Sequence, residues 1–247
     1  HEIIEEADLT SLGRNGNGRA TPAELDALVH RKLAAFGLET AASHRGGPAY
    51  DPHVEVVALL KRLASSPVPI AGCSLADLDP ERTLREWNFV LPVEAITPVA
   101  MANIIAEFGP DTIRTPYSLR VRDLRPEAIG GFLTGIADYA FEHRGRWFVL
   151  DWKSTHLGSN RDDYAREALG RAAQERHYLL QLMIYTLGLH RYLRTRIIDY
   201  DFDRHIGGAG IVFLRGVDGV TDRGFYLLTP RRELIEAMDS MLSPVAA

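Results

Sequence analysis

Apolar residues recur at helical spacing through the first third of the chain. Thr21 caps a helix that opens on proline, Glu24 completes a capping box, and apolar residues follow on one face up to Leu33. A second apolar stripe follows Pro52 and extends to about residue 64, and residues 1–12 form an acidic helical segment. The pattern therefore predicts a mainly helical part over residues 1–82.

From residue 83 onward the pattern becomes that of an α/β domain, with strand-like and helical runs in alternation. The predicted strands are 84–93, 132–142, 146–154, 209–214 and 224–229; the predicted helices are 97–108, 162–196 with a break near His177-Tyr178, and 230–241; and residues 109–130 are loop-like. This order favours helices on both faces of a mixed sheet. We expect residues 83–247 to form the core and residues 1–82 a helical N-terminal addition, together one domain.

The hairpin predicted over residues 132–154 carries the most informative polar residues. If its two-residue turn is Arg144-Gly145, Asp138 lies directly opposite Asp151, with side chains about 5 Å apart. Lys153 follows two residues after Asp151 and so points to the same face, whereas the intervening Trp152 faces the core.

Two carboxylates placed opposite each other repel unless a positive charge lies between them. A divalent cation would supply that charge, because Mg2+ is held by one or two carboxylates together with water and substrate phosphate. Lys153 beside such an ion could orient a water or stabilise developing charge. The alternative is that both strands expose a polar face and that these residues are solvated charges.

Composition limits the classes of protein and the cellular locations to which this chemistry could belong. The chain has 247 residues and a net charge of −5, which gives no global signature of a nucleic-acid binder. The single cysteine excludes an internal disulfide and favours a reducing, intracellular location, and no apolar run approaches the ~20 residues of a membrane span. Only three of the 28 basic residues are lysines. Lys153 therefore stands out, since an amine can do chemistry that a guanidinium cannot.

The hairpin resembles the motif of PD-(D/E)xK nucleases: Asp138, twelve residues, then Asp151-Trp152-Lys153. The wider context is closer still to the RecB family, in the C-terminal nuclease domain of the exodeoxyribonuclease V beta subunit. The similar stretches are 135–138, 150–154, 189–193, 199–201 and 213–218. The resemblance is dense over residues 131–230 and thin over the first 80. It implies a restriction-endonuclease-like fold, a mixed sheet flanked by helices.

The resemblance implies a role for each matching residue. Asp138 and Asp151 match metal-binding aspartates, and Lys153 matches the catalytic lysine. Gln181 and Tyr185 match a Gln-x-x-x-Tyr motif that places the DNA strand near the metal. They are four residues apart and so share a helix face, where a surface hydrogen bond is the alternative interpretation. The implied cofactor is Mg2+, with Mn2+ as a substitute.

Other residues match the family less directly. The resemblance places His1 where a helix upstream of the core carries a metal-ligating histidine, and a neutral imidazole is a suitable third ligand; a chain end without that role is the alternative. Glu86 resembles a glutamate of the preceding strand, with a salt bridge as its alternative. Arg191, Arg194 and Arg196 are candidates for phosphate contact. Because the chain starts with His1 rather than Met, we expect it to be part of a longer protein.

Together these expectations describe a Mg2+-dependent deoxyribonuclease domain of a RecBCD-type helicase-nuclease, acting in double-strand break repair and recombination in the bacterial cytoplasm. The implied partners are DNA, with single-stranded ends preferred, and RecC-like and RecD-like subunits, with no membrane. The chain has no Walker A sequence and so cannot unwind DNA by itself. Two alternatives remain open: a non-catalytic docking module of such a complex, against which the intact Asp138, Asp151 and Lys153 argue, and a stand-alone restriction-type or phage nuclease.

Overall fold

The structure is a computed structural model that describes residues 1–12, 20–38, 51–125 and 129–242. The chain divides into two compact units. The first contains His1–Thr83, Trp152–Arg166 and Val212–Phe225, and the second contains Leu84–Asp151, Glu167–Ile211 and Tyr226–Ala247. The expected division into residues 1–82 and 83–247 of one domain stays a prediction. Within the described ranges, no helix combines the length and the apolar composition needed to cross a membrane.

The early part of the first unit is helical, as its apolar pattern predicts. Its main helices are α1 (Glu2–Glu6), α2 (Pro22–Ala35) and α3 (Pro52–Ser65), with short 3-10 turns η1 (Leu9–Leu12), η2 (Leu75–Asp77) and η3 (Pro80–Arg82). The capping box at the start of α2 is present, because the Glu24 backbone N–H donates to Thr21 Oγ1 at 3.2 Å and the Thr21 N–H donates to the Glu24 carboxylate at 2.6 Å. Asp51 caps α3 through the His53 N–H at 2.9 Å.

Two short strands in this unit have no counterpart in the sequence prediction. β1 (Pro67–Val68) pairs antiparallel with β2 (Cys73–Ser74). Two residues are too few to show a strand period, so hydrophobic alternation could not reveal them. The unit also contains the 3-10 turns η4 (Arg161–Tyr164) and η5 (Leu214–Gly216).

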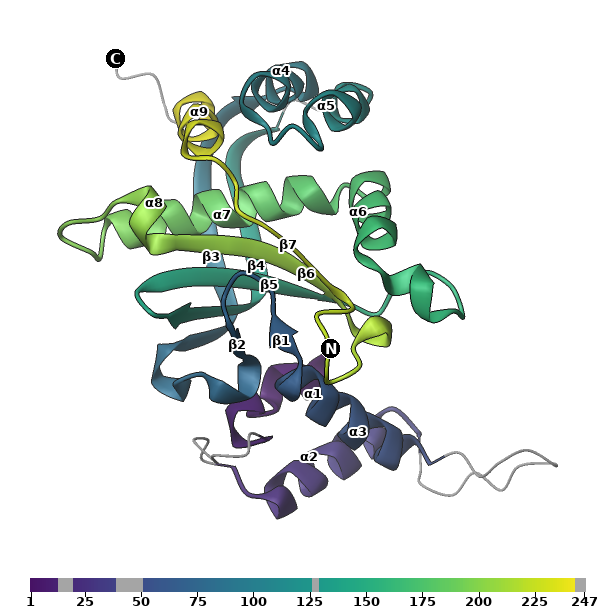
Figure 1. Cartoon of the computed structure of the whole chain (residues 1–247). Helices are drawn as coiled ribbons and strands as arrows, with labels where there is room; N and C mark the ends of the chain where they lie inside the picture. Colours follow the sequence, from purple (N-terminus) through teal and green to yellow (C-terminus); the bar gives the residue numbers. More distant parts are fainter. Residues whose placement is uncertain (13–19, 39–50, 126–128, 243–247) are drawn as a thin grey trace. The chain divides into compact units, whose positions relative to one another are not determined.

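A five-stranded mixed sheet flanked by helices confirms the predicted α/β class (Figure 1). Its strands are β3 (Thr83–Ile96), β4 (Ile129–His143), β5 (Arg146–Lys153), β6 (Ile206–Phe213) and β7 (Phe225–Leu228), in the order β3-β4-β5-β6-β7. β5 and β6 are neighbours although helices intervene in the sequence, so a helical crossover joins them. The remaining helices are α4 (Pro98–Phe108), α5 (Arg114–Arg122), α6 (Arg166–Glu175), α7 (Tyr178–Arg194), α8 (Phe202–His205) and α9 (Arg232–Leu242).

Helix α5 corrects the prediction of a loop over residues 109–130. The segment is strongly polar and contains Pro116, which argues against a helix interior. In the structure Pro116 is the third residue of α5, and a first-turn residue has no intrahelical partner for its N–H in any case. Tyr117 and Val121 bury one face of α5, and Figure 1 shows this helix side by side with α4.

The predicted helix over residues 162–196 is broken where the sequence suggested. α6 ends at Glu175 and α7 begins at Tyr178, and His177 between them has a left-handed backbone with φ of 57°. The N–H of Leu180, in the first turn of α7, donates to the buried hydroxyl of Tyr117 at 3.0 Å. The break turns the chain so that α7 runs along the sheet (Figure 1).

Strand β6 begins at Ile206, three residues before the predicted position. Its first residues include glycines, which are not typical of strands, so the sequence pattern did not indicate a strand there. A Cβ atom at Gly207 would lie 2.3 Å from the Phe148 ring, and one at Gly210 would lie 2.5 Å from Leu227. Glycine is therefore required where the large side chains of β5 and β7 cross this fully buried strand.

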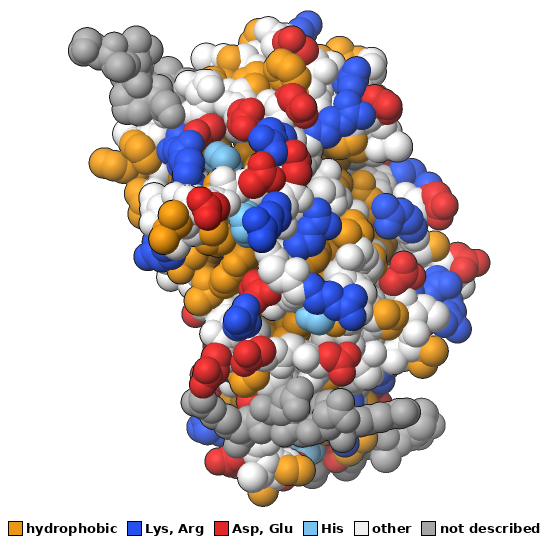
Figure 2. Space-filling model, turned by 60° about the vertical axis from the view of Figure 1, so that its left-hand side comes forward, with side chains coloured by type: hydrophobic (Ala, Val, Ile, Leu, Met, Phe, Trp, Pro, Cys, Tyr) orange, Lys and Arg blue, Asp and Glu red, His pale blue; other side chains and the backbone are white. Residues whose placement is uncertain are grey.

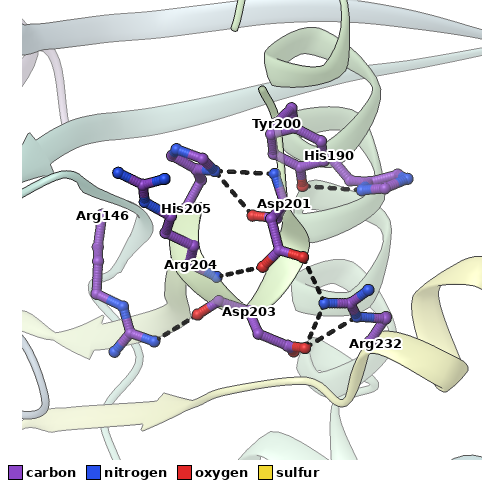
Figure 3. A network of polar contacts seen from close by, with 8 residues as sticks. All are labelled: Arg146, His190, Tyr200, Asp201, Asp203, Arg204, His205 and Arg232. Atoms are coloured by element: carbon purple, nitrogen blue, oxygen red, sulfur yellow. Dashed lines mark hydrogen bonds and ion pairs between the residues drawn. The ribbon is translucent and has the colours of Figure 1, made fainter. Parts of the chain in front are cut away.

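A polar network fixes the entry into β6, as Figure 3 shows. Asp201 caps α8 by accepting from the Arg204 N–H at 2.9 Å. Arg232 of α9 pairs with Asp201 at 2.7 Å and with Asp203 at 2.5 Å. Arg146, the first residue of β5, donates to the Asp203 carbonyl at 2.8 Å. These contacts tie α9 and β5 to the segment that precedes β6.

Candidate active site

The β4–β5 hairpin turns at Arg144-Gly145, as the sequence predicts. Both residues have positive φ, 53° and 81°, which is the type I′ geometry that suits the twist of a two-residue hairpin. The register pairs His143 with Arg146 and continues to Tyr139 with Leu150. The predicted hairpin geometry is therefore confirmed up to the pair Tyr139–Leu150. If the register continues by one more step, Asp138 lies opposite Asp151.

Asp151 is a buried carboxylate that receives neutral polar groups from helix α7. Its side chain lies in the middle of the sheet and the residue is 3% exposed. Gln181 Nε2 donates to Asp151 Oδ1 at 2.9 Å, and the Tyr185 hydroxyl lies 3.2 Å from the same oxygen. Gln181 Nε2 also lies 2.7 Å from the Tyr185 hydroxyl. The structure therefore brings together three of the residues that the sequence analysis singled out.

The hydroxyl of Tyr185 links β4 to β5. It donates to the backbone carbonyl of Ile136 at 2.5 Å, two residues from Asp138, and it also reaches Asp151. Burial raises the pKa of Tyr185, and the negative charges of Asp151 and Asp138 raise it further. Tyr185 thus stays a neutral donor at physiological pH, and both aspartates are close enough to act on it.

The ring of Phe89 sets how closely α7 approaches β4. A Cβ atom at Gly135 of β4 would lie 2.2 Å from this ring, and one at Gly188 of α7 would lie 2.8 Å from it. The Phe89 ring meets the Tyr185 ring edge-on, with centroids 5.8 Å apart. This contact was not among the sequence predictions. Glycine inside a strand and inside a helix is the sequence signal that could have indicated it, because such a glycine marks a close approach.

Lys153 is the last residue of β5 and is half-buried. Strand alternation puts it on the same face as Asp151, while Trp152 between them is 1% exposed and belongs to the core. The arrangement matches the Asp-x-Lys pattern expected from the sequence.

His1 and Glu86 have less support from the structure. His1 is exposed and precedes α1 in the first unit, where its carbonyl accepts from the Ile4 N–H at 2.7 Å. Glu86 is an exposed residue of β3 with a positive φ of 46°, and its carbonyl accepts from the Asn88 side chain at 3.0 Å. The roles of His1 as a metal ligand and of Glu86 in the site stay predictions.

The arginines near the end of α7 have a structural role. Arg191 hydrogen-bonds Asp239 of α9 through Nε, and an Arg194 nitrogen lies 3.1 Å from the other oxygen of Asp239. The Arg196 guanidinium lies over the Tyr192 ring, 4.0 Å from its centroid. The side chain of Arg191 is only 16% exposed, and contact of these arginines with phosphate stays a prediction.

The residues around Asp151 fit a hard divalent cation. Mg2+ prefers carboxylate and other oxygen ligands and retains several waters. Asp151 offers a buried carboxylate oriented by Gln181, and the register brings the carboxylate of Asp138 to the neighbouring strand. On the face of the molecule that Figure 2 shows, basic and acidic side chains are interspersed rather than gathered into one basic field.

Comparison with known proteins finds RecB subunits of the RecBCD enzyme. The chain is 37% identical to RecB of Escherichia coli K12 over 180 residues, which are 72% of this chain and 15% of that protein. It is 35% identical to RecB of Haemophilus influenzae over 170 residues, covering 69% of this chain and 14% of the relative. Identity to RecB of Mycobacterium tuberculosis is 29% over 275 residues, covering 96% of this chain and 25% of the relative.

These similarities confirm the resemblance to RecB that the hairpin and the later segments indicate. The chain spans between about one seventh and one quarter of the length of these relatives. No family model matches the chain.

Proposed function

We propose that this chain, a relative of part of the RecB subunit of RecBCD enzymes, is a Mg2+-dependent deoxyribonuclease domain that hydrolyses phosphodiester bonds of DNA. Its context would be a RecBCD-type helicase-nuclease of the bacterial cytoplasm that acts in double-strand break repair and recombination. RecC-like and RecD-like subunits would be its partners, and single-stranded ends its preferred substrate. The observation that carries the proposal is the buried Asp151 held by Gln181 and Tyr185, with Asp138 on the neighbouring strand.

In this proposal each residue of the site has a distinct task. Asp138 and Asp151 hold the cation through carboxylate oxygens. When bound, the ion would polarise the scissile phosphate and lower the pKa of a water. Lys153 stabilises negative charge that develops on the phosphate or orients the attacking water. Gln181 fixes the orientation of Asp151, because partners outside the ligand shell set the direction of a metal ligand.

The net charge supports a nuclease that binds DNA weakly and receives the strand from other subunits, rather than a protein that binds DNA tightly by itself. Neutralisation of phosphates supplies most non-specific affinity for DNA, and this chain carries a net charge of −5. We therefore expect slow, sequence-indifferent cleavage that declines steeply as the salt concentration rises. The motor and partner subunits of a larger machine would supply the strand to the site.

Cleavage of end-labelled single-stranded and duplex DNA, with Mg2+, with Mn2+ and with a chelator, tests the proposal. The wild-type chain should cut only with a metal. Asp151→Asn and Lys153→Ala should lower the rate by about a thousandfold, since metal and electrostatic stabilisation contribute several kcal/mol to such a barrier. Asp162→Asn is the matched control, because that aspartate side chain is 95% exposed; it should cut at the wild-type rate.

Three results would overturn the proposal. Cleavage at the wild-type rate by Asp151→Asn would remove the site assignment. Metal binding without any cleavage by the wild-type chain would indicate a docking module. Salt-insensitive cutting with strong sequence preference would indicate a restriction-type enzyme.

A further inference from the structure

A second group of metal-ligating side chains lies in the first unit, at the junction of α2 and α3. Asp26 and His30 are four residues apart on α2 and so share one face of that helix. His53 comes from the first turn of α3. One potential ligand atom from each of the three residues lies within 4.8 Å of the other two.

Each imidazole lies close to the carboxylate of Asp26. His53 Nε2 lies 2.9 Å from Asp26 Oδ1, and His30 Nε2 lies 3.6 Å from Asp26 Oδ2. Two ligands that each lie about 2.0–2.1 Å from a zinc ion, at a tetrahedral angle, are about 3.4 Å apart. The spacing of the three side chains is therefore of the order that a small ion needs.

The state of His53 points to a ligand rather than to a simple ion pair. Its side chain is 13% exposed and its Nε2 atom is buried. Asp26 lies 2.9 Å away, but Nε2 has no hydrogen-bond partner among the described residues. A buried polar atom in that condition is costly unless something else occupies its lone pair.

The stacking of the two imidazoles favours the same conclusion. The rings of His30 and His53 are 4.0 Å apart at 18°, face to face. This stacking holds the two imidazoles, which come from different helices, next to each other. Two imidazoles and one carboxylate form a donor set typical of Zn2+, with a fourth position left for water.

We propose that Asp26, His30 and His53 bind a Zn2+ ion that clamps α2 to α3. This site differs from the Asp138–Asp151 pair in both its location and its chemistry. It uses imidazole nitrogen, which suits Zn2+, whereas the hairpin offers the carboxylate oxygens that suit Mg2+. The ion would raise the stability of the first unit by binding only its folded form.

The test is a titration of the full chain with Zn2+, and with Co2+ as a spectroscopic probe, in buffer that contains millimolar Mg2+. We expect one equivalent of Zn2+, a rise in melting temperature, and visible absorption by Co2+ typical of a nitrogen- and oxygen-ligated site. Acid should weaken binding, because an imidazole nitrogen must lose its proton to bind metal. Binding should persist in the Asp138→Ala chain, which separates this site from the nuclease site.

His30→Gln combined with His53→Gln should weaken Zn2+ binding by more than about tenfold, the loss that removing even a supporting partner of a metal ligand brings. His156→Gln, an exposed histidine of the same unit, is the matched control and should bind as the wild type does. If the double variant does not fold, Asp26→Asn provides the same test, since that side chain is 55% exposed. No saturable Zn2+ binding by the wild type, or equal binding by these variants, would overturn the proposal.

Discussion

Helix α7 contacts two buried carboxylates, one near each of its ends, and it offers neutral groups to one and charged groups to the other. Near its start, Gln181 and Tyr185 offer neutral groups to Asp151. Near its end, Arg191 and Arg194 offer guanidinium groups to Asp239 of α9. The two aspartates are similarly buried, at 3% and 9% exposure. Burial is therefore similar at the two aspartates, whereas the groups that α7 offers to them differ in charge.

The difference has a physical reason. A guanidinium fork satisfies a carboxylate fully and leaves little reason for an added cation. The amide of Gln181 and the hydroxyl of Tyr185 orient Asp151 without adding a positive charge from α7, and Asp138 lies on the neighbouring strand. The first arrangement joins two helices, and in the proposed function the second supplies carboxylate oxygens to a divalent ion.

The largest expected effect that separates the two regions is on stability. Asp239→Asn leaves the largely buried Arg191 without its charged partner and should lower the free energy of unfolding by about 3 kcal/mol. Asp151→Asn should change it by less than about 1 kcal/mol, because the amide oxygen can still accept from Gln181. Urea unfolding of both variants measures this, and equal losses would remove the distinction between the two carboxylates.

The next effect concerns the groups that orient Asp151. Gln181→Ala should lower Mg2+ affinity or the cleavage rate by about 10- to 100-fold, since it removes a hydrogen bond that directs a metal ligand. Tyr192→Phe, a tyrosine on the same helix that contacts Trp87 and Arg196, is the control and should leave both quantities unchanged. Metal titration and cleavage kinetics report the result, and an unaffected Gln181→Ala chain would contradict the positioning role.

The smallest effect is a pH dependence in the structural region. Burial lowers the pKa of His190, although the charge of Asp239 acts in the opposite direction. The unfolded chain therefore takes up a proton at this residue more readily than the folded chain. The stability that His190 contributes is present above its ordinary pKa of about 6.5 and is lost as the pH falls through the lowered value.

His190→Gln should thus flatten the loss of stability in acid while cleavage at neutral pH stays the same. Thermal unfolding between pH 7 and pH 5 measures this slope. An unchanged slope in the variant would show that other groups account for the acid sensitivity.

Local chemistry made the hairpin predictable. The turn Arg144-Gly145 and the alternation on both arms fix a register, and a register fixes which residues face each other. The four-residue spacing of Gln181 and Tyr185 fixes their common helix face, which the structure turns toward Asp151. Helix α5 was missed because Pro116 and many polar residues surround the apolar residues Tyr117 and Val121, whose four-residue spacing is the signal of its buried face.

Contacts between distant segments account for what the sequence could not show. Phe89, Gly135 and Gly188 come from three separate elements, and the Phe89 ring lies against both glycines. His53 meets Asp26 and His30 from a different helix. Arg191 pairs with Asp239, which is 48 residues away in the sequence. Periodicity describes one element at a time and does not say which elements meet.

The central claim is that Asp138 and Asp151 hold a cation and that Asp239, which pairs with Arg191, does not. The most direct test is the effect of Mg2+ on the melting temperature of the wild type and of two variants. The wild-type melting temperature should rise with Mg2+, since about 100-fold saturation corresponds to about 2.7 kcal/mol. Asp138→Ala should lose this rise, and Asp239→Asn should keep it from a lower starting temperature. A wild-type melting temperature that stays flat up to millimolar Mg2+, or a rise that Asp138→Ala retains, would contradict the account.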